Sequence, residues 1–430
     1  MRRNMTWALL AAILTLLMPA GLALIATGLG RAKNAAHTML GHSLGSAVAL
    51  LSFFAIGFAL AGANPSAASN AGWTVAHFRG FFLHGMQNDG AALCWFLISA
   101  ASGVIALVIP LGAMSERLTL KAHLGLAIAI GGVLYPLAAC WLWTGGWLNQ
   151  LGTHLHLPHG SIDYAGAGAV HLLGGTIALV GAMIVRPRFG KFDLQGTPRP
   201  LLGHHVPMVI LGTMIVAFAW MGFTTSRSFL GNDGQAPLVA VNTLLAGAGG
   251  ALGAAGYMWL RFGRPDPSLT CNGLLAGLVS ISAGCAYVAP SASLVIGVTG
   301  GVFAIAAVLF IEKRRVDDPV GASSVHGLAG VWGMLAVALF ANGSGSVRGL
   351  LYGGGAGLLA VQVIAVVAII VLATAGTVIT FWLIERIVDS VRVSADIEFA
   401  GLDIPETGAP GYPEFVASQG ADGLTDRSMP

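Results

Sequence analysis

The chain has 430 residues, of which 56% are hydrophobic and only 9% are charged, and its formal net charge at pH 7 is +3. This composition excludes an ordinary soluble domain and is typical of a protein that lies within a lipid bilayer. The positive charge comes from short Lys and Arg clusters between apolar runs, so it does not indicate a nucleic-acid partner. The four cysteines have no CxxC spacing, which predicts neither a disulfide framework nor a zinc site.

Apolar runs of about 20 residues, the length that crosses about 30 Å of hydrocarbon, recur along the whole chain. They predict an all-α membrane protein with eleven transmembrane helices. In chain order the predicted spans are 5–29, 39–62, 90–114, 122–143, 163–186, 205–225, 237–259, 270–288, 291–311, 319–341 and 351–386. The first run is longer than the apolar part of a signal peptide and lacks a convincing cleavage site, so we interpret it as a span, with a cleaved signal as the alternative.

Lys and Arg indicate the orientation of the spans, because cytoplasmic connections are enriched in these residues. With the N-terminus outside, 16 of the 21 basic residues fall on one side: Arg31, Lys33, Arg117, Lys121, Arg186, Arg188, Lys191, Arg199, Arg261, Arg264, Lys313, Arg314, Arg315, Arg386, Arg392 and Arg427. The other side keeps Arg2, Arg3, Arg79, Arg227 and Arg348. We therefore predict a multi-pass protein of the cell (inner) membrane, with its N-terminus outside and its C-terminus in the cytoplasm.

Two distant segments share one sequence frame. The stretches "DYAGAGAVHLLGG" (163–175) and "DPVGASSVHGLAG" (318–330) both read DxxGAxxVHxLxG and lie 155 residues apart. An odd number of spans separates them, so they run through the membrane in opposite directions, as internal repeats of transporters often do. In each copy the His follows the Asp by eight residues, about 12 Å along a helix. We expect His171 and His326 to meet at the middle of the bilayer.

The two polar positions of the frame differ in what they imply. Asp163 and Asp318 stand at predicted helix starts, where capping of free N–H groups is enough to account for them. A single buried His is also compatible with packing, but two at equivalent depth in a membrane indicate a pathway. Two neutral imidazoles can share a hydrogen bond and still offer polar atoms to a guest, and they are too few for a stable metal site. The predicted guest is small, polar and uncharged at the midplane.

Several longer motifs resemble one family. The segment "DYAGAGAVHLLGGTIALVGAMIVRPRFGKF" is similar to the signature of the Amt/Mep/Rh ammonium transporters, and further family-like motifs follow in the family's order: "GLGRAKN", "GAMSER", "YPLAACWLWTGG", "AWMGF", "VDDPVGASSVHG" and "GLDIP". The resemblance implies a homotrimer with one narrow pore in each protomer, lined by His171 and His326. It also implies that ammonium is recruited outside, gives up a proton and crosses largely as ammonia.

The resemblance also implies roles for aromatic side chains. Trp143 matches the Trp that recruits the cation, through an attraction to ring faces of about 0.5–2 kcal/mol. Phe223 matches one of the two Phe residues that close the pore, and Trp220 lies one helical turn before it. Plain packing is the alternative for an aromatic residue in an apolar run, but the motif positions favour these roles. Together with Asp163, Trp143 belongs to the predicted outer vestibule.

The chain departs from the family pattern at this outer entrance. Ser102 stands where the second gate Phe is expected and Ile98 where the adjacent Phe is expected. Arg227, in "GFTTSRSF", replaces the Ser that hydrogen-bonds the recruited ammonium. A guanidinium accepts no hydrogen bond and stays charged, so it repels ammonium if it faces the vestibule. The alternative is a surface role, with Arg227 turned toward Asp233 or toward lipid headgroups.

We therefore predict an ammonium/ammonia channel or transporter that needs no cofactor or metal. It is not an enzyme, because no nucleophile-and-base constellation or phosphate-binding loop is present. The altered entrance leaves two alternatives: an ammonium sensor or regulatory homologue with weak conduction, and an Rh-like channel for neutral gases. Three His in "HLHLPHG" (154–160) permit a metal site, although a solvated loop is the simpler interpretation.

The predicted organisation is one membrane domain followed by a tail. The membrane domain covers 1–390, with two inverted five-helix repeats at about 5–186 and 205–341 and a long last helix at 351–386. The tail, 391–430, is predicted to be cytoplasmic, and its "ETGAPGYPEF" loosely resembles the region where the family contacts the signal protein PII. The predicted partners are ammonium or ammonia, the lipid bilayer, further copies of the chain in a homotrimer, and PII.

Overall fold

The computed structural model describes residues 2–63, 73–157, 159–230 and 233–414. Within these ranges it contains helices, turns and a few isolated bridges between single residues, and no β-strand. Ten helical segments are long and apolar enough to cross a membrane, and one further helix is apolar but shorter. The predicted all-α membrane fold is confirmed, and the expected eleven helices are consistent with it.

The spans follow one another along the chain with short connections. The first five consist of α1 (Arg2–Thr15) with α2 (Met18–Leu29), α3 (Ala35–Ser52) with η2 (Phe53–Gly57) and α4 (Phe58–Ala61), α5 (Gly90–Ala113), α6 (Leu120–Ala129) with η5 (Ile130–Leu134) and α7 (Tyr135–Trp143), and η6 (Ala167–Leu172) with α9 (Leu173–Val185). The other six are α10 (Val206–Thr225), α11 (Ala236–Phe262), α12 (Pro267–Ser282), α13 (Pro290–Lys313), η9 (Ser323–Leu328) with α14 (Ala329–Phe340), and α15 (Gly357–Ile387). Outside the spans, the short helices are α8 (Leu151–Leu155), α16 (Ala395–Ala400) and α17 (Asp403–Thr407).

The eighth and the last span differ most from their predicted limits. The eighth, α12, ends at Ser282 rather than near 288, and a turn then leads to Pro290 at the start of α13. Proline fits this position because the N–H that it lacks would have no partner in the first turn of a helix. The last span, α15, begins at Gly357 rather than at 351, because Leu350–Tyr352 form a separate helical turn.

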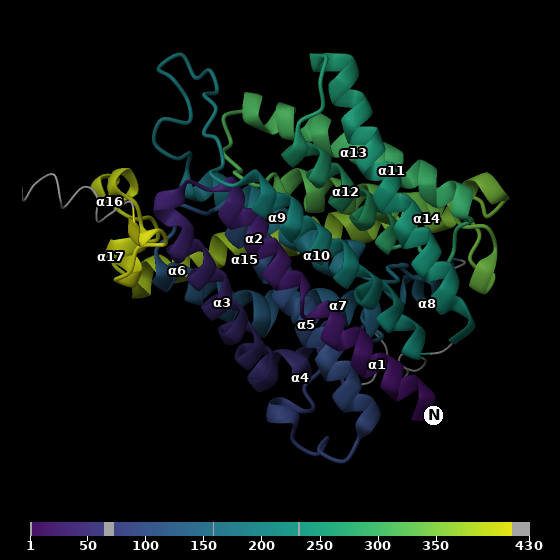
Figure 1. Ribbon diagram of the computed structural model, residues 1–430. Coiled ribbons are helices and arrows are strands. Elements are labelled where there is room, and N and C mark those ends of the chain that lie inside the picture. Colours follow the sequence, from purple (N-terminus) through teal and green to yellow (C-terminus); the bar gives the residue numbers. More distant parts are fainter. Residues whose placement is uncertain (1, 64–72, 158, 231–232, 415–430) are drawn as a thin grey trace, which may run out of the picture.

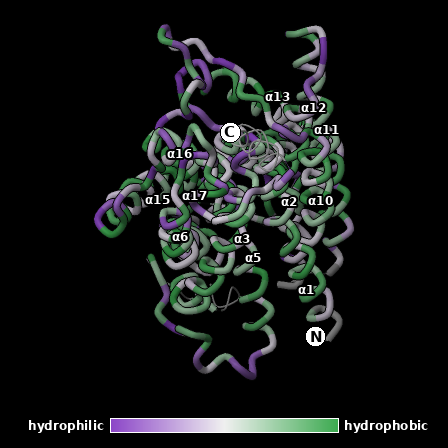
Figure 2. The backbone as a smooth tube through the Cα atoms, turned by 60° about the vertical axis from the view of Figure 1, so that its left-hand side comes forward, coloured by the Kyte–Doolittle hydropathy of each residue, from purple (hydrophilic) through white to green (hydrophobic). Residues whose placement is uncertain are grey.

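The helices pack into one bundle, which α15 crosses along its length (Figure 1). The start of α1 and the helices α16 and α17 lie at opposite ends of this bundle. Hydrophobic residues dominate the helices, whereas hydrophilic residues gather in the connections and in the tail (Figure 2). Large apolar side chains such as Met214, Phe218 and Leu252 are exposed on the outer surface of the spans. This pattern suits a bundle surrounded by lipid.

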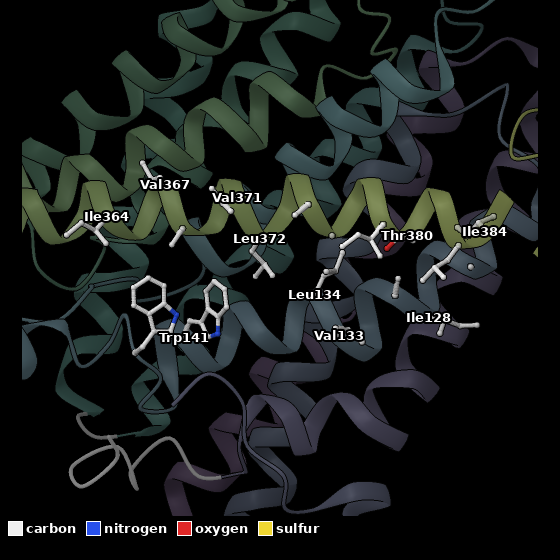
Figure 3. Close-up of a pocket in the computed structure, with 18 of the residues that line it drawn as sticks. Ile128, Val133, Leu134, Trp141, Ile364, Val367, Val371, Leu372, Thr380 and Ile384 are labelled. Atoms are coloured by element: carbon white, nitrogen blue, oxygen red, sulfur yellow. The ribbon is translucent and has the colours of Figure 1, made fainter. Parts of the chain in front are cut away.

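An apolar groove of about 1010 Å³ runs along the side of the bundle (Figure 3). Helix α15 provides one wall with residues such as Val367 and Leu372, and the segment from α6 to α7 provides the other with residues such as Val133 and Trp141. Almost no polar side chain lines the groove, so its surface suits hydrocarbon chains and not water. The groove thus belongs to the apolar outer surface of the spans.

Buried charges join the connections at the end of the bundle that lies near α16. Asp317 accepts hydrogen bonds from Arg117 Nη1 at 2.7 Å and from Arg188 Nε at 2.8 Å, and Arg188 Nη1 also donates to Glu116 Oε1 at 3.1 Å. Burial by itself raises the pKa of the Asp317 carboxyl, but Arg188 and Arg117 outweigh burial and hold this pKa well below its usual range. The network fastens the connections that follow α5 and α9 to the one that precedes η9.

Tail carboxylates cap two spans from outside their own sequence. Asp403 Oδ1 accepts a hydrogen bond from the backbone N–H of His37 in the first turn of α3, at 2.9 Å. Glu406 Oε2 accepts one from the N–H of Leu120, the first residue of α6, at 2.8 Å. The first N–H groups of a helix have no partner within it, so such acceptors stabilise its start. Residues 415–430 of the predicted tail lie outside the described residues.

Replacing Asp317 by Asn should destabilise the fold by about 3–5 kcal/mol, because Arg117 would lose its ion-pair partner in a buried site and Arg188 would keep only Glu116. The pKa of Asp317 is lowered on folding, so its contribution is complete above the ordinary carboxyl pKa near 4 and is lost as the pH falls through the lower folded value. Thermal unfolding of the purified protein in detergent measures the change. Asp389→Asn, at an exposed carboxylate, is the control, and equal unfolding temperatures for both variants would contradict the prediction.

Candidate functional site: a histidine pair between two half-helices

Both copies of the repeated frame begin with a carboxylate cap. Asp163 accepts hydrogen bonds from three backbone N–H groups within 166–169, at 2.9–3.0 Å. Asp318 Oδ2 accepts hydrogen bonds from both the backbone N–H and the hydroxyl of Ser323, each at 2.7 Å. Each Asp therefore caps the start of the span that contains the His of its own frame.

The backbone that follows each Asp has the same unusual shape in both copies. Gly166 and Gly321 occupy equivalent positions of the frame and have φ values of +99° and +72°, a left-handed conformation that favours glycine. The next segments, η6 and η9, are both π-helical. Such turns are rare and occur frequently at functional sites. In both copies the π-helical turn contains the histidine.

The last glycine of the frame allows the two copies to touch. A Cβ at Gly175 would lie 2.0 Å from the backbone N of Gly327, and a Cβ at Gly330 would lie 2.8 Å from the carbonyl oxygen of Ala167. No larger residue fits at Gly175 unless the backbone moves. The two spans therefore cross with their backbones in contact, as small residues permit in membranes.

This crossing brings the two histidine side chains together. Nδ1 of His171 and Nδ1 of His326 are 3.2 Å apart, and the two ring centroids are 5.2 Å apart. His171 is completely buried, and only 3% of His326 is exposed. In the neutral pair one Nδ1 donates and the other accepts, which leaves one Nε2 as acceptor and the other as N–H donor. Nε2 of His171 is buried and has no hydrogen-bond partner among the described residues.

Aromatic side chains of α10 cover the pair on one side. Trp220 stacks on the imidazole of His171 with ring centroids 4.8 Å apart, and Phe223 meets the same imidazole edge-on at 5.6 Å. The indole N–H of Trp220 donates to Ser282 Oγ at 3.2 Å, which fixes the orientation of the ring. A cavity of about 20 Å³, lined largely by apolar side chains, borders His326. This volume is only about that of one water-sized probe, so the cavity next to His326 could hold no more than a very small molecule.

A larger, more polar cavity of about 380 Å³ has Trp143, Asp163, Tyr164, Arg227 and Tyr287 in its lining. The indole N–H of Trp143 donates to the backbone oxygen of Asp163 at 2.7 Å. The structure thus brings together three of the four residues predicted for the outer vestibule.

The fourth predicted residue of the vestibule is Ser102. It is buried on α5, and its hydroxyl donates to the carbonyl oxygen of Ile98 one turn earlier, at 2.8 Å. It is not among the described residues that line the polar cavity.

Arg227 lies among aromatic rings. Its guanidinium carbon is 3.7 Å from the ring centroid of Trp143 and 4.6 Å from that of Trp95. Within the described part of the chain, no carboxylate forms an ion pair with Arg227. The side chain of Asp233, the alternative partner, lies outside the described side chains.

Sequence reasoning missed two aromatic residues of this region. Trp95 is 1% exposed, and its ring lies 6.3 Å from that of Trp143, nearly at a right angle. Tyr135 is also fully buried, 6.4 Å from Trp143. A lone aromatic residue in an apolar run is usually a packing residue, so no local pattern identified either of them.

The histidines of the loop 154–160 have separate surroundings. His154 stacks on Trp73 with ring centroids 4.6 Å apart, and Nε2 of His159 is 3.1 Å from the carbonyl oxygen of Ser346. No group of three or more His, Cys, Asp or Glu that could hold a metal ion occurs among the residues that the structure describes.

A bundle of apolar spans that encloses a buried pair of polar side chains and a separate polar cavity is typical of a membrane transport protein. The chain matches the model of the Ammonium Transporter Family over residues 6–412. It is 38% identical to ammonium transporter Amt2 of Archaeoglobus fulgidus, over 97% of this chain and 89% of that protein. It is 32% identical to ammonium transporter 1 member 3 of Solanum lycopersicum, over 95% of this chain and 93% of that protein.

Solved structures show the same likeness. A sensor Amt protein has a TM-score of 0.85 and 29% identity, and the match covers 94% of this chain and 98% of that one. Mep2 of Candida albicans has a TM-score of 0.81 and 25% identity, and the match covers 92% of this chain and 87% of that one. The chain belongs to the ammonium transporter family.

Gly175→Ala should destabilise the protein by about 1–3 kcal/mol, because the added methyl group would press on the backbone of Gly327. This clash would force apart the two half-helices, which are η6 with α9 and η9 with α14. Thermal unfolding in detergent measures this loss. Gly256→Ala is the matched control: a Cβ at Gly256 meets nothing within 4 Å, and alanine favours the helix by about 1 kcal/mol. If Gly175→Ala and Gly256→Ala were equally stable, the contact between Gly175 and Gly327 would tolerate a side chain, and the prediction would be wrong.

Proposed function

We propose that this protein carries ammonium nitrogen across a cell membrane and that the nitrogen passes His171 and His326 as neutral ammonia. The supporting observation is the unpartnered Nε2 of His171 beside the shared Nδ1–Nδ1 contact. An unpaired ion in a dry interior costs many kcal/mol, whereas ammonia can exchange hydrogen bonds with a donor and an acceptor. The pair provides one of each.

The surroundings of the pair support passage of a small molecule. Trp220 and Phe223 both contact the imidazole of His171, and we propose that these two rings form the gate and the pore wall. The cavity that contains Trp143, Asp163 and Arg227 is the proposed outer vestibule. Asp163 and Asp318 act as positioning residues, because their carboxylates hold the helix starts that precede the two histidines.

We also propose the orientation and assembly of the chain. The basic residues support an outside N-terminus and a cytoplasmic tail in the cell (inner) membrane. The equivalent caps, glycines and π-helical turns of the frame support two inverted repeats, at about 5–186 and 205–341, in a domain over 1–390. Membership of the family supports a homotrimer. The tail from 391 docks at the end of the bundle where a cytoplasmic PII protein would reach it.

Replacing either histidine of the pair by Ala should lower ammonia flux by about tenfold or more, because each loss of a hydrogen-bond partner in the dry passage costs about 1–3 kcal/mol. The measurement is the initial rate of internal pH change in proteoliposomes after addition of an ammonium salt. His84→Ala, at an exposed histidine, is the control and should conduct like the wild type. Unchanged flux in His171→Ala and His326→Ala would remove the pair from the pathway.

A sensor with weak conduction is the second candidate function. It is favoured by Arg227 in the lining of the polar cavity, and the structural likeness to a sensor Amt protein agrees with it. The same proteoliposome assay separates the two candidates. Wild-type flux well above that of the His171→Ala variant supports a transporter, whereas flux equal to that of empty liposomes supports a sensor.

A further inference from the structure

We propose that the guanidinium of Arg227 permanently occupies the cation site formed by the rings of Trp95 and Trp143 in the outer vestibule. As a result, the pore takes up neutral ammonia rather than ammonium ion. This inference rests on the proposed function, because it concerns the entrance of the same pore. It assigns Arg227, together with Trp95 and Trp143, the selection of the species that enters.

The two indoles are held so that their faces meet the guanidinium. The N–H of Trp143 donates to the backbone oxygen of Asp163 at 2.7 Å, and the N–H of Trp95 donates to the backbone oxygen of Gly62 at 3.0 Å. With each indole edge fixed, the rings stand at 74° to each other. The guanidinium carbon of Arg227 lies 3.7 Å from one ring centroid and 4.6 Å from the other, well within the range of cation–π attraction.

Among the side chains that the structure describes, the two rings are the direct partners of this charge and no carboxylate pairs with it. The Asp163 carboxylate lines the same cavity, but its two oxygens accept hydrogen bonds from backbone N–H groups at 2.9–3.0 Å. Only 9% of Arg227 is exposed, and its Nη2 is buried without a hydrogen-bond partner among the described residues. A guanidinium stays charged and is more weakly hydrated than an ammonium group, so it is the cation best suited to such a site.

An ammonium ion therefore meets an occupied site. At 3.7 Å from the centroid, the guanidinium covers the face of Trp143 that borders it, which leaves no room there for a second cation. A like charge about 4 Å away would weaken binding by about fivefold in water and by more in a cavity of lower dielectric. Neutral ammonia is not repelled by the guanidinium, and it does not need a cation site on the face of Trp143.

The inference has a direct consequence for the pH dependence of uptake. If only ammonia enters, the initial rate at fixed total ammonium should rise about tenfold for each unit of external pH well below the pKa of the ammonium ion, because the neutral fraction rises in that proportion. The rate at fixed ammonia should not change with the ammonium concentration. A pore that recruits the cation would instead saturate with ammonium.

A binding experiment tests whether the site is occupied. Tryptophan fluorescence of the detergent-purified full chain is titrated with ammonium chloride and, separately, with guanidinium chloride, at constant ionic strength and pH, with sodium chloride as the reference salt. The wild type and Arg227→Lys should show no saturable change. Arg227→Ser should bind both cations, each at least about tenfold more tightly than the wild type does. Arg79→Ser, which removes an exposed charge elsewhere on the predicted outer side, should behave like the wild type.

Flux measurements on the same proteins complete the test. Wild-type uptake in proteoliposomes should follow the ammonia concentration, and Arg227→Ser uptake should become saturable in ammonium. Saturable ammonium binding by the wild type, or no gain of binding by a folded Arg227→Ser, overturns the inference. If Arg227→Ser does not fold, the wild-type titration still decides. Failure of the proposed function is a different result, namely no flux that depends on His171 in any variant.

Discussion

The close backbone contact at Gly175 and Gly330 is the constraint on which the rest of the site depends. A Cβ at either glycine would run into the backbone of the other half-helix, at 2.0 Å and 2.8 Å respectively. Because lipid offers no hydrophobic drive for helix association, small residues and close packing must hold such a crossing together. The contact places the imidazoles of the two frame copies within 3.2 Å of each other. The repeated frame therefore builds one buried polar site from two distant segments.

The histidine pair and the polar cavity contain different kinds of polar group. Between the two frame copies, two neutral imidazole rings share a hydrogen bond, and Nε2 of His171 remains without a partner among the described residues. At the polar cavity, a permanent charge on Arg227 is balanced by the faces of Trp95 and Trp143. Desolvated cation–π contacts contribute about 2 kcal/mol or more each, so the two rings stabilise the charge although no ion pair with it occurs among the described residues. In the proposed function, the histidine pair passes ammonia, and the charge of Arg227 selects the species that reaches the pair.

The end of the bundle near the tail supports the crossing from a distance. Asp317 lies directly before Asp318 of the second frame copy and accepts hydrogen bonds from Arg117 and Arg188. Arg188 stands three residues beyond the end of α9, the helix that continues from His171 and carries Gly175. The network thus ties together the chain segments that lead into and out of the two half-helices. Tail carboxylates add caps to α3 and α6 at the same end.

Much of this could be predicted from the sequence because the relevant physics is local or repeated. Apolar runs of about 20 residues determine the spans, since backbone groups in lipid must form their hydrogen bonds within the segment. The doubled frame indicated the capping roles of Asp163 and Asp318, and its opposite directions through the membrane indicated that the two histidines meet. The longer motifs indicated the family, to which the chain does belong.

Only the tertiary structure decided where Arg227 goes and what surrounds it. Its position in "TTSRS" is compatible with lipid headgroups, with a carboxylate or with the cavity, and the sequence contains no local signal that selects among them. The partner Trp95 comes from another span and looks like a packing residue in its own neighbourhood. Hydropathy and spacing determine which segments enter the membrane, because these properties depend on neighbours along the chain. Which side chains then meet depends on how the helices pack, and packing brings together residues that no local pattern connects.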